Sequence, residues 1–447
     1  QIIFDKKSLP AQSTDFDAIF EHGKTGMSVT VTGKMVKSPK DKQPIEMQAI
    51  SYDICGDVAN PDTYPIAKKE HTLEYLRTLP HLRIRTDTYS CVARIKSALV
   101  FGFREYFDEL GFCEVHTPLI TDNECESGAN PFTVSTLMTK QTSDIPKTVQ
   151  TDLIDYSKDF FSKHVYLTVS AQLHGECLVL GGLGKAFWMT IACRGEASQS
   201  QIHAAEFWML EWELCFSTIK DNMDITEGLV KHSITKVLKK CRPDLEFLQQ
   251  KYKPGLIATL EKYCMQPFVR TTHEECVRLM LADIESGKVK IDSKKKPEDG
   301  LFVFKEIPGY DDDLSKDHER YITQVLHDEM PVFVFGYPLK IKAFYMTEIN
   351  TEDTIRRVDN FDMLMPSIGE VIGGSSRESD YDTLKARMIE HGIEPESLKF
   401  YLDTRKYGSV SHSGAGLGVE RLLLAITGLT NIRDIIPFPR TYGSCQY

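Results

Sequence analysis

Two apolar, strand-like runs flank a polar loop between residues 189 and 214, which read MTIACRGEASQSQIHAAEFWMLEWEL. Such runs on both sides of a polar loop are typical of a hairpin. One arm would carry Arg194 and Glu196, and the returning arm would carry Phe207 and Glu211. The pattern therefore predicts two paired strands with charged and aromatic side chains near the loop.

Apolar residues recur every three or four positions between residues 92 and 110, which predicts one face of a long helix. The residues on this face are Val92, Ile95, Leu99, Phe103, Tyr106 and Leu110. A short strand is expected after the helix, and Pro118 would end it because proline cannot donate a hydrogen bond to a neighbouring strand.

Residues 408 to 428, GSVSHSGAGLGVERLLLAITG, join a glycine-rich stretch to an apolar helix. Gly414, Gly416 and Gly418 would let the backbone bend tightly and approach another group. Arg421 lies in the first turn of the expected helix, where its fork of donors suits a phosphate. An ordinary ion pair on a glycine-capped core helix explains this stretch equally well when it is taken alone.

The first 60 residues are expected to form strands at QIIF, MSVTVTGKMV and IEMQAISYDICG. Val29, Val31 and Met35 would share one face of an alternating strand, which suggests the half-buried wall of a small barrel. A plain β-domain that binds no nucleic acid is the alternative. Residues 61 to 88 contain three spaced prolines, and this pattern predicts a connector between domains.

Composition limits the possible functions. The 447 residues suffice for two or three domains, and the 41% hydrophobic content is that of an ordinary soluble protein. With 53 basic and 64 acidic side chains, the chain does not resemble a basic module that binds any nucleic acid. Eleven cysteines without a CxxC pair indicate reduced thiols rather than a disulfide framework or zinc site. No apolar run approaches the ~18 residues that a membrane span needs.

Two carboxylates stand beside a Gly-Gly-Ser bend, Asp362 and Glu370, and Arg377 follows the bend. Such a pair suits a magnesium ion that bridges ATP phosphates, because this cation takes oxygen ligands and usually keeps several waters. Surface acids that flank a turn are the ordinary alternative. Residues 217 to 330 have a mainly helical pattern, and no chemistry is assigned to them.

Three of these stretches resemble the three signatures of the class II aminoacyl-tRNA synthetases. The long helix with its proline-ended strand is similar to the first signature. The second is matched by the hairpin with Arg194, Glu196 and Phe207, and the third by GAGLGVER with its apolar helix. The resemblance implies an α+β fold, in which residues 89–447 form an antiparallel-sheet catalytic domain flanked by helices.

Residues 1–60 resemble the later strands of the oligonucleotide-binding (OB) barrel that the aspartyl, asparaginyl and lysyl enzymes use to read the anticodon. Residues 61–88 would then form the hinge between this partial barrel and the catalytic domain. The resemblance implies ATP and Mg²⁺ as cofactors and a homodimer that pairs through residues 92 to 120.

The resemblance also implies a role for individual residues. Arg194, Glu196 and Arg421 would be catalytic, with Arg194 on the α-phosphate, Glu196 on the adenine amino group, and the adenine between Phe207 and Arg421. The full sets are Arg194, Glu196, His203, Phe207, Glu370, Gly418 and Arg421 for ATP, Glu126, Gln172, Arg377 and His412 for the amino acid, and Asp362 and Glu370 for the metal.

Within the family, the chain is most similar to the asparaginyl branch. Aspartyl enzymes carry a lysine three residues after the glutamine that is Gln172 here, whereas this chain has Gly175. We expect that an aspartate side chain would be left with part of its charge unmet, and that asparagine is therefore preferred. A departure from the family lies in the hairpin loop, where Gln201 and Ile202 replace two arginines that commonly precede His203.

The expected function is ATP-dependent activation of asparagine to asparaginyl-adenylate and its transfer to tRNA(Asn), in the cytoplasm and without a membrane partner. The aspartyl reaction is the alternative. An ammonia-dependent asparagine synthetase and a non-catalytic amino-acid sensor are more remote alternatives. The sensor is disfavoured because the arginines and acids of the signatures are all present.

Overall fold

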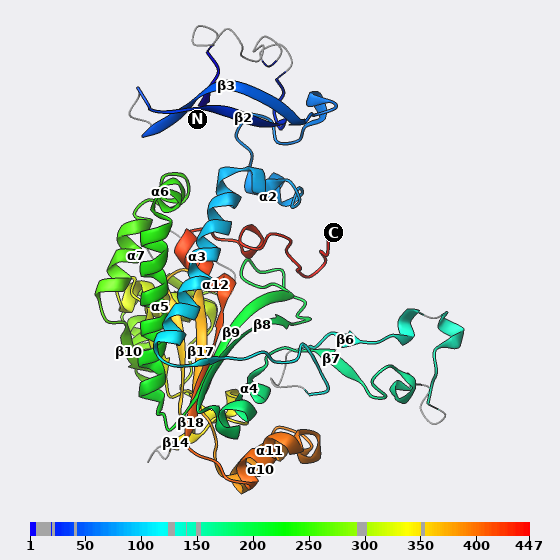
Figure 1. Ribbon diagram of the computed structural model, residues 1–447. Helices are drawn as coiled ribbons and strands as arrows, with labels where there is room; N and C mark the ends of the chain where they lie inside the picture. Colours follow the sequence, from blue (N-terminus) through cyan, green and yellow to red (C-terminus); the bar gives the residue numbers. More distant parts are fainter. Residues whose placement is uncertain are drawn as a thin grey trace. The chain divides into compact units, whose positions relative to one another are not determined.

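The structure is a computed structural model. It describes residues 1–5, 19, 23–39, 43–123, 130–139, 141–148, 153–292, 302–349 and 354–447. The chain folds as two units, residues 1–83 and residues 84–447 (Figure 1). No helix in the described ranges is both long and apolar enough to cross a membrane.

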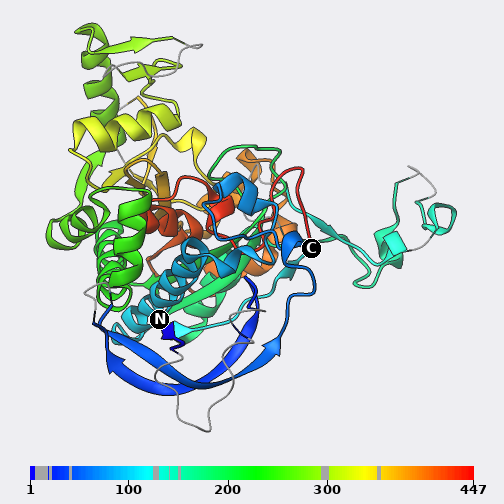
Figure 2. The ribbon, with the colours of Figure 1, turned by 90° about the horizontal axis from the view of Figure 1, so that it is seen from above.

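The described part of the first unit forms a three-stranded sheet in the order β1-β3-β2, followed by one short helix. The elements are β1 (Ile2–Ile3), β2 (Ser28–Lys37), β3 (Ile45–Gly56) and α2 (Leu73–Arg77). The strands predicted for this part of the chain are therefore confirmed. Figure 2 shows that β2 and β3 bend strongly along their length.

The predicted alternation in β2 fails after its midpoint. Val29 and Val31 are half-buried as expected, but Met35 is 52% exposed and Val36 is half-buried instead. The pairing with β3 shifts register next to Gly33, where a Cβ would lie 2.3 Å from the carbonyl oxygen of Gln48. The shift leaves Ile50 of β3 without a partner in β2, and the alternation of β2 breaks two residues beyond Gly33, at Met35.

The second unit is built on an eight-stranded sheet in the order β10-β13-β16-β17-β18-β9-β8-β4. Its central pairs are antiparallel, and the two edge pairs are parallel. The strands are β4 (Cys113–Glu114), β8 (Lys185–Cys193), β9 (Glu206–Cys215), β10 (Val269–Thr272), β13 (Val332–Phe335), β16 (Asn360–Met365), β17 (Gly369–Ser376) and β18 (His412–Gly418). The predicted hairpin is confirmed as β8 and β9, in which Ala192 pairs with Phe207.

Helices cover one face of this sheet, and Figure 1 shows α3 and α5 running side by side. The layer contains α3 (Asp87–Glu109), α5 (Ile219–Lys240), α6 (Arg242–Lys251), α7 (Leu256–Met265) and α12 (Val419–Thr427). Val92, Ile95, Leu99 and Phe103 of α3 are buried, which confirms most of the predicted helix face. Leu110 follows the end of α3 and is 37% exposed. Trp212 of β9 donates its indole N–H to Asn222 Oδ1 of α5 at 2.9 Å, which ties the sheet to the layer.

The glycine-rich stretch is a central strand, β18, and the tight bend expected there is wrong. β18 pairs with β17 on one side and β9 on the other. The close approach expected of its glycines is confirmed, because a Cβ at Gly414 would lie 1.9 Å from Glu213 Oε2. The helix that follows ends at Gly428 with a φ of 71°, as the sequence predicted.

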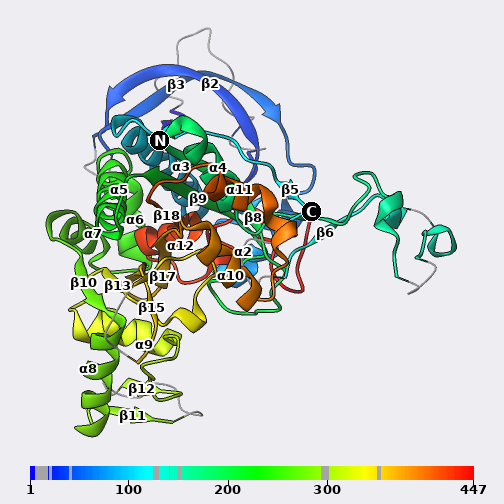
Figure 3. The same ribbon diagram turned by 90° about the horizontal axis from the view of Figure 1, so that it is seen from below.

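The remaining elements lie around the sheet and in two extensions of the second unit, which Figure 3 shows. One extension carries α8 (His273–Glu285), β11 (Val289–Ile291) and β12 (Phe302–Phe304), and the other is an arm with β5 (Ile120–Thr121), β6 (Thr133–Val134) and β7 (Val165–Leu167). The other elements are α4 (Gln172–Leu178), α9 (Lys316–Tyr321), β14 (Glu348–Ile349), β15 (Arg357–Val358), α10 (Tyr381–Glu390) and α11 (Lys399–Lys406). The mainly helical pattern predicted for residues 217–330 missed the three strands β10, β11 and β12.

Candidate active site

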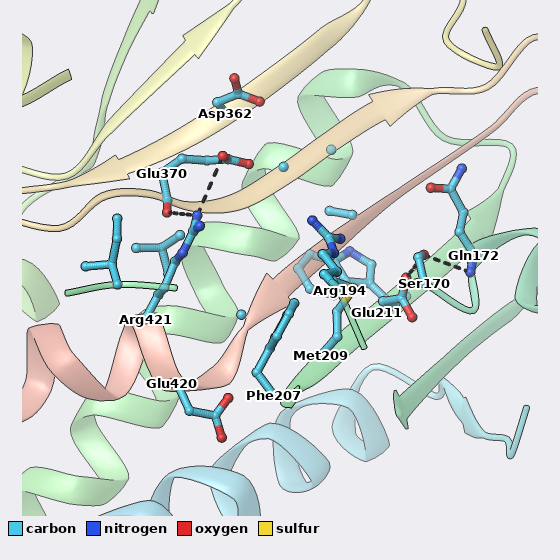
Figure 4. Close-up of a pocket in the computed structure, with 18 of the residues that line it drawn as sticks. Ser170, Gln172, Arg194, Phe207, Met209, Glu211, Asp362, Glu370, Glu420 and Arg421 are labelled. Atoms are coloured by element: carbon cyan, nitrogen blue, oxygen red, sulfur yellow. Dashed lines mark hydrogen bonds and ion pairs between the residues drawn. The ribbon is translucent and has the colours of Figure 1, made fainter. Parts of the chain in front are cut away.

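A cavity of about 290 Å³ opens on the second unit's sheet, on the side of β9 that bears Phe207, Met209 and Glu211 (Figure 4). Side chains alternate between the two faces of a strand, so the intervening residues of β9 point toward the helices. Most residues that the sequence singled out line this cavity: Gln172, Arg194, Glu196, His203, Phe207, Asp362, Glu370, Arg377, Gly418 and Arg421.

Two guanidinium groups stand along the cavity wall. The Arg194 guanidinium lies over the Phe207 ring, 5.5 Å from its centroid, and its Nη2 donates to the Val169 carbonyl at 3.4 Å. Arg421 Nη1 donates to the Glu370 carbonyl at 2.9 Å and lies 3.7 Å from Glu370 Oε2. Planar forks fixed in this way are suited to phosphate oxygens.

The structure also decides between the two interpretations of the Glu420-Arg421 pair. Glu420 is the structural partner, because its carboxylate accepts from Lys96 of α3 at 2.7 Å and from the Trp208 amide at 3.0 Å. Arg421 instead turns toward the cavity and Glu370, and Figure 4 shows the two side chains pointing apart. Glu420 thus pairs with Lys96 in the structural layer, while Arg421 pairs with Glu370 and lines the cavity.

His203 and Glu196 lie at the hairpin-loop end of the cavity, with His203 Nε2 3.9 Å from Glu196 Oε2. Ser200 Oγ forms a hydrogen bond with His203 Nδ1. Partial burial lowers the pKa of His203, and the nearby charges of Lys316 and Arg421 lower it further. The imidazole is therefore neutral at pH 7 and adds no full positive charge to this end.

The predicted carboxylate pair faces one common space. A Cβ at Gly373 would lie 3.1 Å from Glu370 Oε1 and 3.7 Å from Asp362 Oδ1. Burial raises the pKa of Asp362 to about 6, although Lys342, whose Nζ donates to Asp362 Oδ2 at 2.7 Å, opposes the shift. Burial and the charges of Glu370 and Asp362 also raise the pKa of a third carboxyl, Glu319, to about 8. Glu319 is therefore mostly protonated at pH 7, while Asp362 pairs with Lys342 and Glu370 lies 3.7 Å from Arg421.

Arg377 marks the opposite end of the cavity, where it is 5% exposed and fixed on three sides. Its Nη2 donates to Glu213 Oε2 at 3.0 Å, its Nε donates to the same carboxylate at 3.2 Å, and its Nη1 donates to Ser375 Oγ at 2.7 Å. Burial raises the pKa of Glu213, while the charge of Arg377 opposes that shift. A second buried carboxylate, Glu176, lies 3.8 Å from Arg377 Nε.

Glu176 is the centre of a buried network behind Arg377. Its Oε1 accepts from Gln172 Nε2 at 2.9 Å, and its Oε2 accepts from Tyr401 Oη at 2.7 Å and from Arg405 Nη2 at 2.8 Å. Burial alone would raise the pKa of Glu176, but the Arg405 charge and the His412 hydrogen bond outweigh burial and lower it. The Arg377 region thus combines two guanidinium groups with two carboxylates.

The structure does not bring every sequence candidate to the cavity wall. His412 was expected to contact the amino acid. It is instead 1% exposed and lies behind the cavity wall, with its Nε2 3.1 Å from Glu176 Oε2. Gln172 does line the cavity, where it is the first residue of α4. Glu126 lies outside the described residues.

Gly175 has a packing role that the sequence did not reveal. A Cβ at this position would lie 1.9 Å from the indole Cη2 of Trp188, which is fully buried. A lysine could not fit here without displacing that ring, so the vacant lysine position is not an open part of the cavity. The absence of a lysine here therefore leaves no gap in the cavity wall.

Three other residues around the cavity were not predicted from the sequence. Glu213 had a usable signal, because it follows Glu211 at the strand period of two and so shares its face. Lys342 and Glu319 had no such signal, since each lies in a segment without a recognisable motif. Their position near Asp362 and Glu370 follows from tertiary packing, which a local pattern does not encode.

Known proteins share this arrangement along almost the entire chain. The family of class II tRNA synthetases (D, K and N) matches residues 72–442. The asparagine–tRNA ligase of Cytophaga hutchinsonii is 41% identical over 423 residues, which cover 95% of this chain and 85% of that protein.

Solved structures show the same similarity. The asparaginyl-tRNA synthetase from Pyrococcus horikoshii, complexed with asparaginyl-adenylate, has a TM-score of 0.78 and 30% identity, and the match covers 100% of this chain and 89% of that chain. The Entamoeba histolytica asparaginyl-tRNA synthetase, also in complex with asparaginyl-adenylate, has a TM-score of 0.77 and 25% identity, with 100% and 89% covered.

Proposed function

The chain belongs to the class II tRNA synthetases (D, K and N), and from this we infer that it activates asparagine with ATP and joins it to tRNA(Asn). Similarity to proteins named asparagine–tRNA ligases over nearly the full length supports this function, as does similarity to two enzymes solved with asparaginyl-adenylate. The observation that carries it in this chain is the buried pair of Arg377 and Glu213, which adjoins a cavity with two phosphate-binding guanidinium groups.

The charges around Arg377 favour a neutral side chain in the substrate. The guanidinium can donate to a side-chain oxygen of either asparagine or aspartate. Glu213 and Glu176 already offset the charges of Arg377 and Arg405, so the carboxylate of aspartate would be a third buried anion. Like charges at short range in a buried site are costly. Asparagine brings no such charge.

Activation is an in-line attack of the asparagine carboxylate on the α-phosphate of ATP, which needs positioning and charge stabilisation. Arg194 lies between the two ends of the cavity and is suited to the α-phosphate. Arg421 is suited to the outer phosphates and to the adenine ring opposite Phe207, with Glu196 near the adenine amino group. Gln172 and Arg377 would hold the amino acid, and Gly418 leaves room for the nucleotide beside Arg421.

Asp362 and Glu370 fit a magnesium ion that is shared with the nucleotide. Both carboxylates face one space, and each could turn an oxygen to a metal beside its partner, Lys342 for Asp362 and Arg421 for Glu370. In the described ranges no group of three or more His, Cys, Asp or Glu side chains could hold a metal by itself. Two carboxylates plus phosphate oxygens are the usual ligands of magnesium, which would offset charge on the phosphates.

Glu370→Gln should therefore raise the magnesium concentration that half-saturates the reaction and lower kcat/KM for ATP by about 100-fold. ATP/pyrophosphate exchange measured over a magnesium series would detect both effects. Glu396→Gln, an exposed acid paired with Lys399, is the matched control and should behave like the unmodified chain. An unchanged magnesium dependence in Glu370→Gln would remove this residue from the metal site.

The first unit is proposed as part of an OB-type domain that reads the anticodon, with residues 61–88 as the hinge. The curved pair of β2 and β3 and the family membership of the chain support this assignment. A chain limited to residues 84–447 contains the whole cavity. It should keep asparagine activation and lose charging of tRNA(Asn) by about 100-fold in kcat/KM, because tRNA contacts would be missing. Equal charging by both chains would contradict this assignment.

A homodimer in the cytoplasm completes the proposal. The dimer is supported by helix α3 and the strand β4 that follows it. The resemblance to the class II synthetases implies that this segment pairs with the same segment of a second subunit across a two-fold axis. Sedimentation velocity measures the oligomeric state directly, and an active monomer would contradict the dimer.

The proposed cytoplasmic location agrees with the cysteines. Those described are all free thiols, as expected in a reducing compartment, and cell fractionation would test the location.

A further inference from the structure

The end of the cavity that would take the outer phosphates is poor in free positive charge. The Glu370 carboxylate, 3.7 Å from Arg421 Nη1, offsets part of the charge of Arg421, and the lowered pKa of His203 keeps that ring neutral. The loop residues before His203 are Gln201 and Ile202, which carry no charge, and Ile202 lines the cavity. A triphosphate carries several negative charges, so this end needs another cation to bind it well.

Helix α9 brings such a cation to this end. Glu319 of α9 accepts from the Glu370 amide at 3.3 Å, and a Cβ at Gly369 would collide with its carboxylate, so α9 packs directly against the start of β17. Lys316 precedes Glu319 by three residues. Residues three apart on a helix lie on the same side, so Lys316 lies one turn before Glu319, the residue that contacts the Glu370 amide.

The electrostatic environment of Lys316 agrees with this position. Partial removal from water lowers its pKa, the charge of Arg421 lowers it further, and the charges of Glu319 and Glu196 oppose the shift. These groups come from three separate parts of the chain that meet only around the phosphate end of the cavity. Lys316 is therefore close enough to respond to both Arg421 and Glu196.

Lys316 also has no competing partner among the described residues. The residue is exposed, and its side chain forms no hydrogen bond or ion pair with the described residues. Two other lysines nearby in the sequence are occupied: Lys340 pairs with Asp311 at 2.5 Å, and Lys342 pairs with Asp362 at 2.7 Å. An unpaired ammonium group beside a phosphate site costs little to engage with an anion.

We propose that Lys316 binds the β- and γ-phosphates of ATP and stabilises the pyrophosphate that leaves, so that α9 supplies the charge that the hairpin loop lacks. The inference rests on the proposed function. In the activation step, an asparagine carboxylate oxygen forms a bond to the α-phosphorus. The bond from that phosphorus to the bridging oxygen breaks, and its electron pair leaves on pyrophosphate. Lys316 is placed to offset this charge without giving up a proton.

Lys316→Ala should lower kcat/KM for ATP in asparagine-dependent exchange by about tenfold, because one charge-assisted contact at an exposed site is lost. The KM for asparagine should stay within about twofold of the unmodified chain, because the Arg377 end is untouched. Lys316→Arg should keep most of the activity. Lys340→Ala is the matched control and should leave both constants unchanged.

A positive charge placed on the hairpin loop should restore part of the kcat/KM for ATP that Lys316→Ala loses. Adding Ile202→Arg to Lys316→Ala places a guanidinium on the opposite wall of the same end, and should recover at least about threefold in kcat/KM for ATP. A merely structural role for Lys316 predicts no such recovery. Thermal unfolding of each variant identifies any loss that comes from misfolding.

Three outcomes would overturn the proposal. The first is an unchanged kcat/KM for ATP in Lys316→Ala, and the second is an equal rise in its KM values for ATP and asparagine. The third is a loss in Lys316→Ala that is confined to tRNA charging, which would assign Lys316 to the tRNA backbone. Failure of the proposed function itself looks different, because the unmodified chain would then show no exchange with asparagine.

Discussion

Arg194→Ala should lower kcat for asparagine-dependent ATP/pyrophosphate exchange by about 1,000-fold, the loss seen when a fixed donor to a developing charge is removed. The Arg194 guanidinium is held above the Phe207 ring and beside the Val169 carbonyl, midway between the two ends of the cavity. Charge on the α-phosphate would develop there. The KM for asparagine should change little, because the side chain does not reach the Arg377 region.

Two comparisons make this result specific. Arg194→Lys keeps the positive charge but loses the planar fork, so it should recover only part of the activity. Arg278→Ala removes an exposed arginine that pairs with Glu275 at 2.7 Å, and it should match the unmodified chain. A loss of less than about tenfold in Arg194→Ala would show that this residue does not stabilise the transition state.

Glu176→Gln should reduce the preference for asparagine over aspartate by about 100-fold, measured as the ratio of their kcat/KM values. The substitution removes one of two carboxylates that offset Arg377 and Arg405, so the carboxylate of aspartate would meet surplus positive charge. Glutamine has nearly the same shape, and its side-chain oxygen can still accept from Tyr401 or Arg405. Asparagine activation should fall as aspartate activation rises.

The ratio separates this effect from simple damage to the core. A misfolded pocket would lose both substrates to the same extent and leave the ratio unchanged, which would contradict the role given to Glu176. Thermal unfolding should show a lower Tm in Glu176→Gln, because a buried network of charged hydrogen bonds is weakened. Glu390→Gln, an exposed acid on α10, should alter neither the ratio nor the Tm.

The sequence was most informative where a local period decides the structure. The helix face of α3 and the β8-β9 hairpin were predicted because their apolar spacing is carried by adjacent residues. The glycine-rich stretch was misjudged because glycines in a strand and in a bend look alike. Gly414 is needed for the close approach of the Glu213 carboxylate, and β9 lies some 200 residues earlier in the chain.

The candidate site was predicted wherever a residue belongs to a signature. Arg194, Phe207 and Arg421 line the cavity because the central strands bring the hairpin and the third signature together. Glu319 and Lys316 could not be predicted, since only the packing of α9 on β17 carries them there. Gly175 was linked to charge selection, whereas its packing against Trp188 gives it a steric role.

The measurement that tests the account most directly is ATP/pyrophosphate exchange by the unmodified chain with asparagine and with aspartate, side by side at equal concentrations. Buried Glu176 and Glu213 already offset the arginines that meet the side chain, so kcat/KM for asparagine should exceed that for aspartate by about 100-fold or more. Equal exchange rates with the two amino acids, or a faster rate with aspartate, would contradict the account and point to the aspartyl reaction.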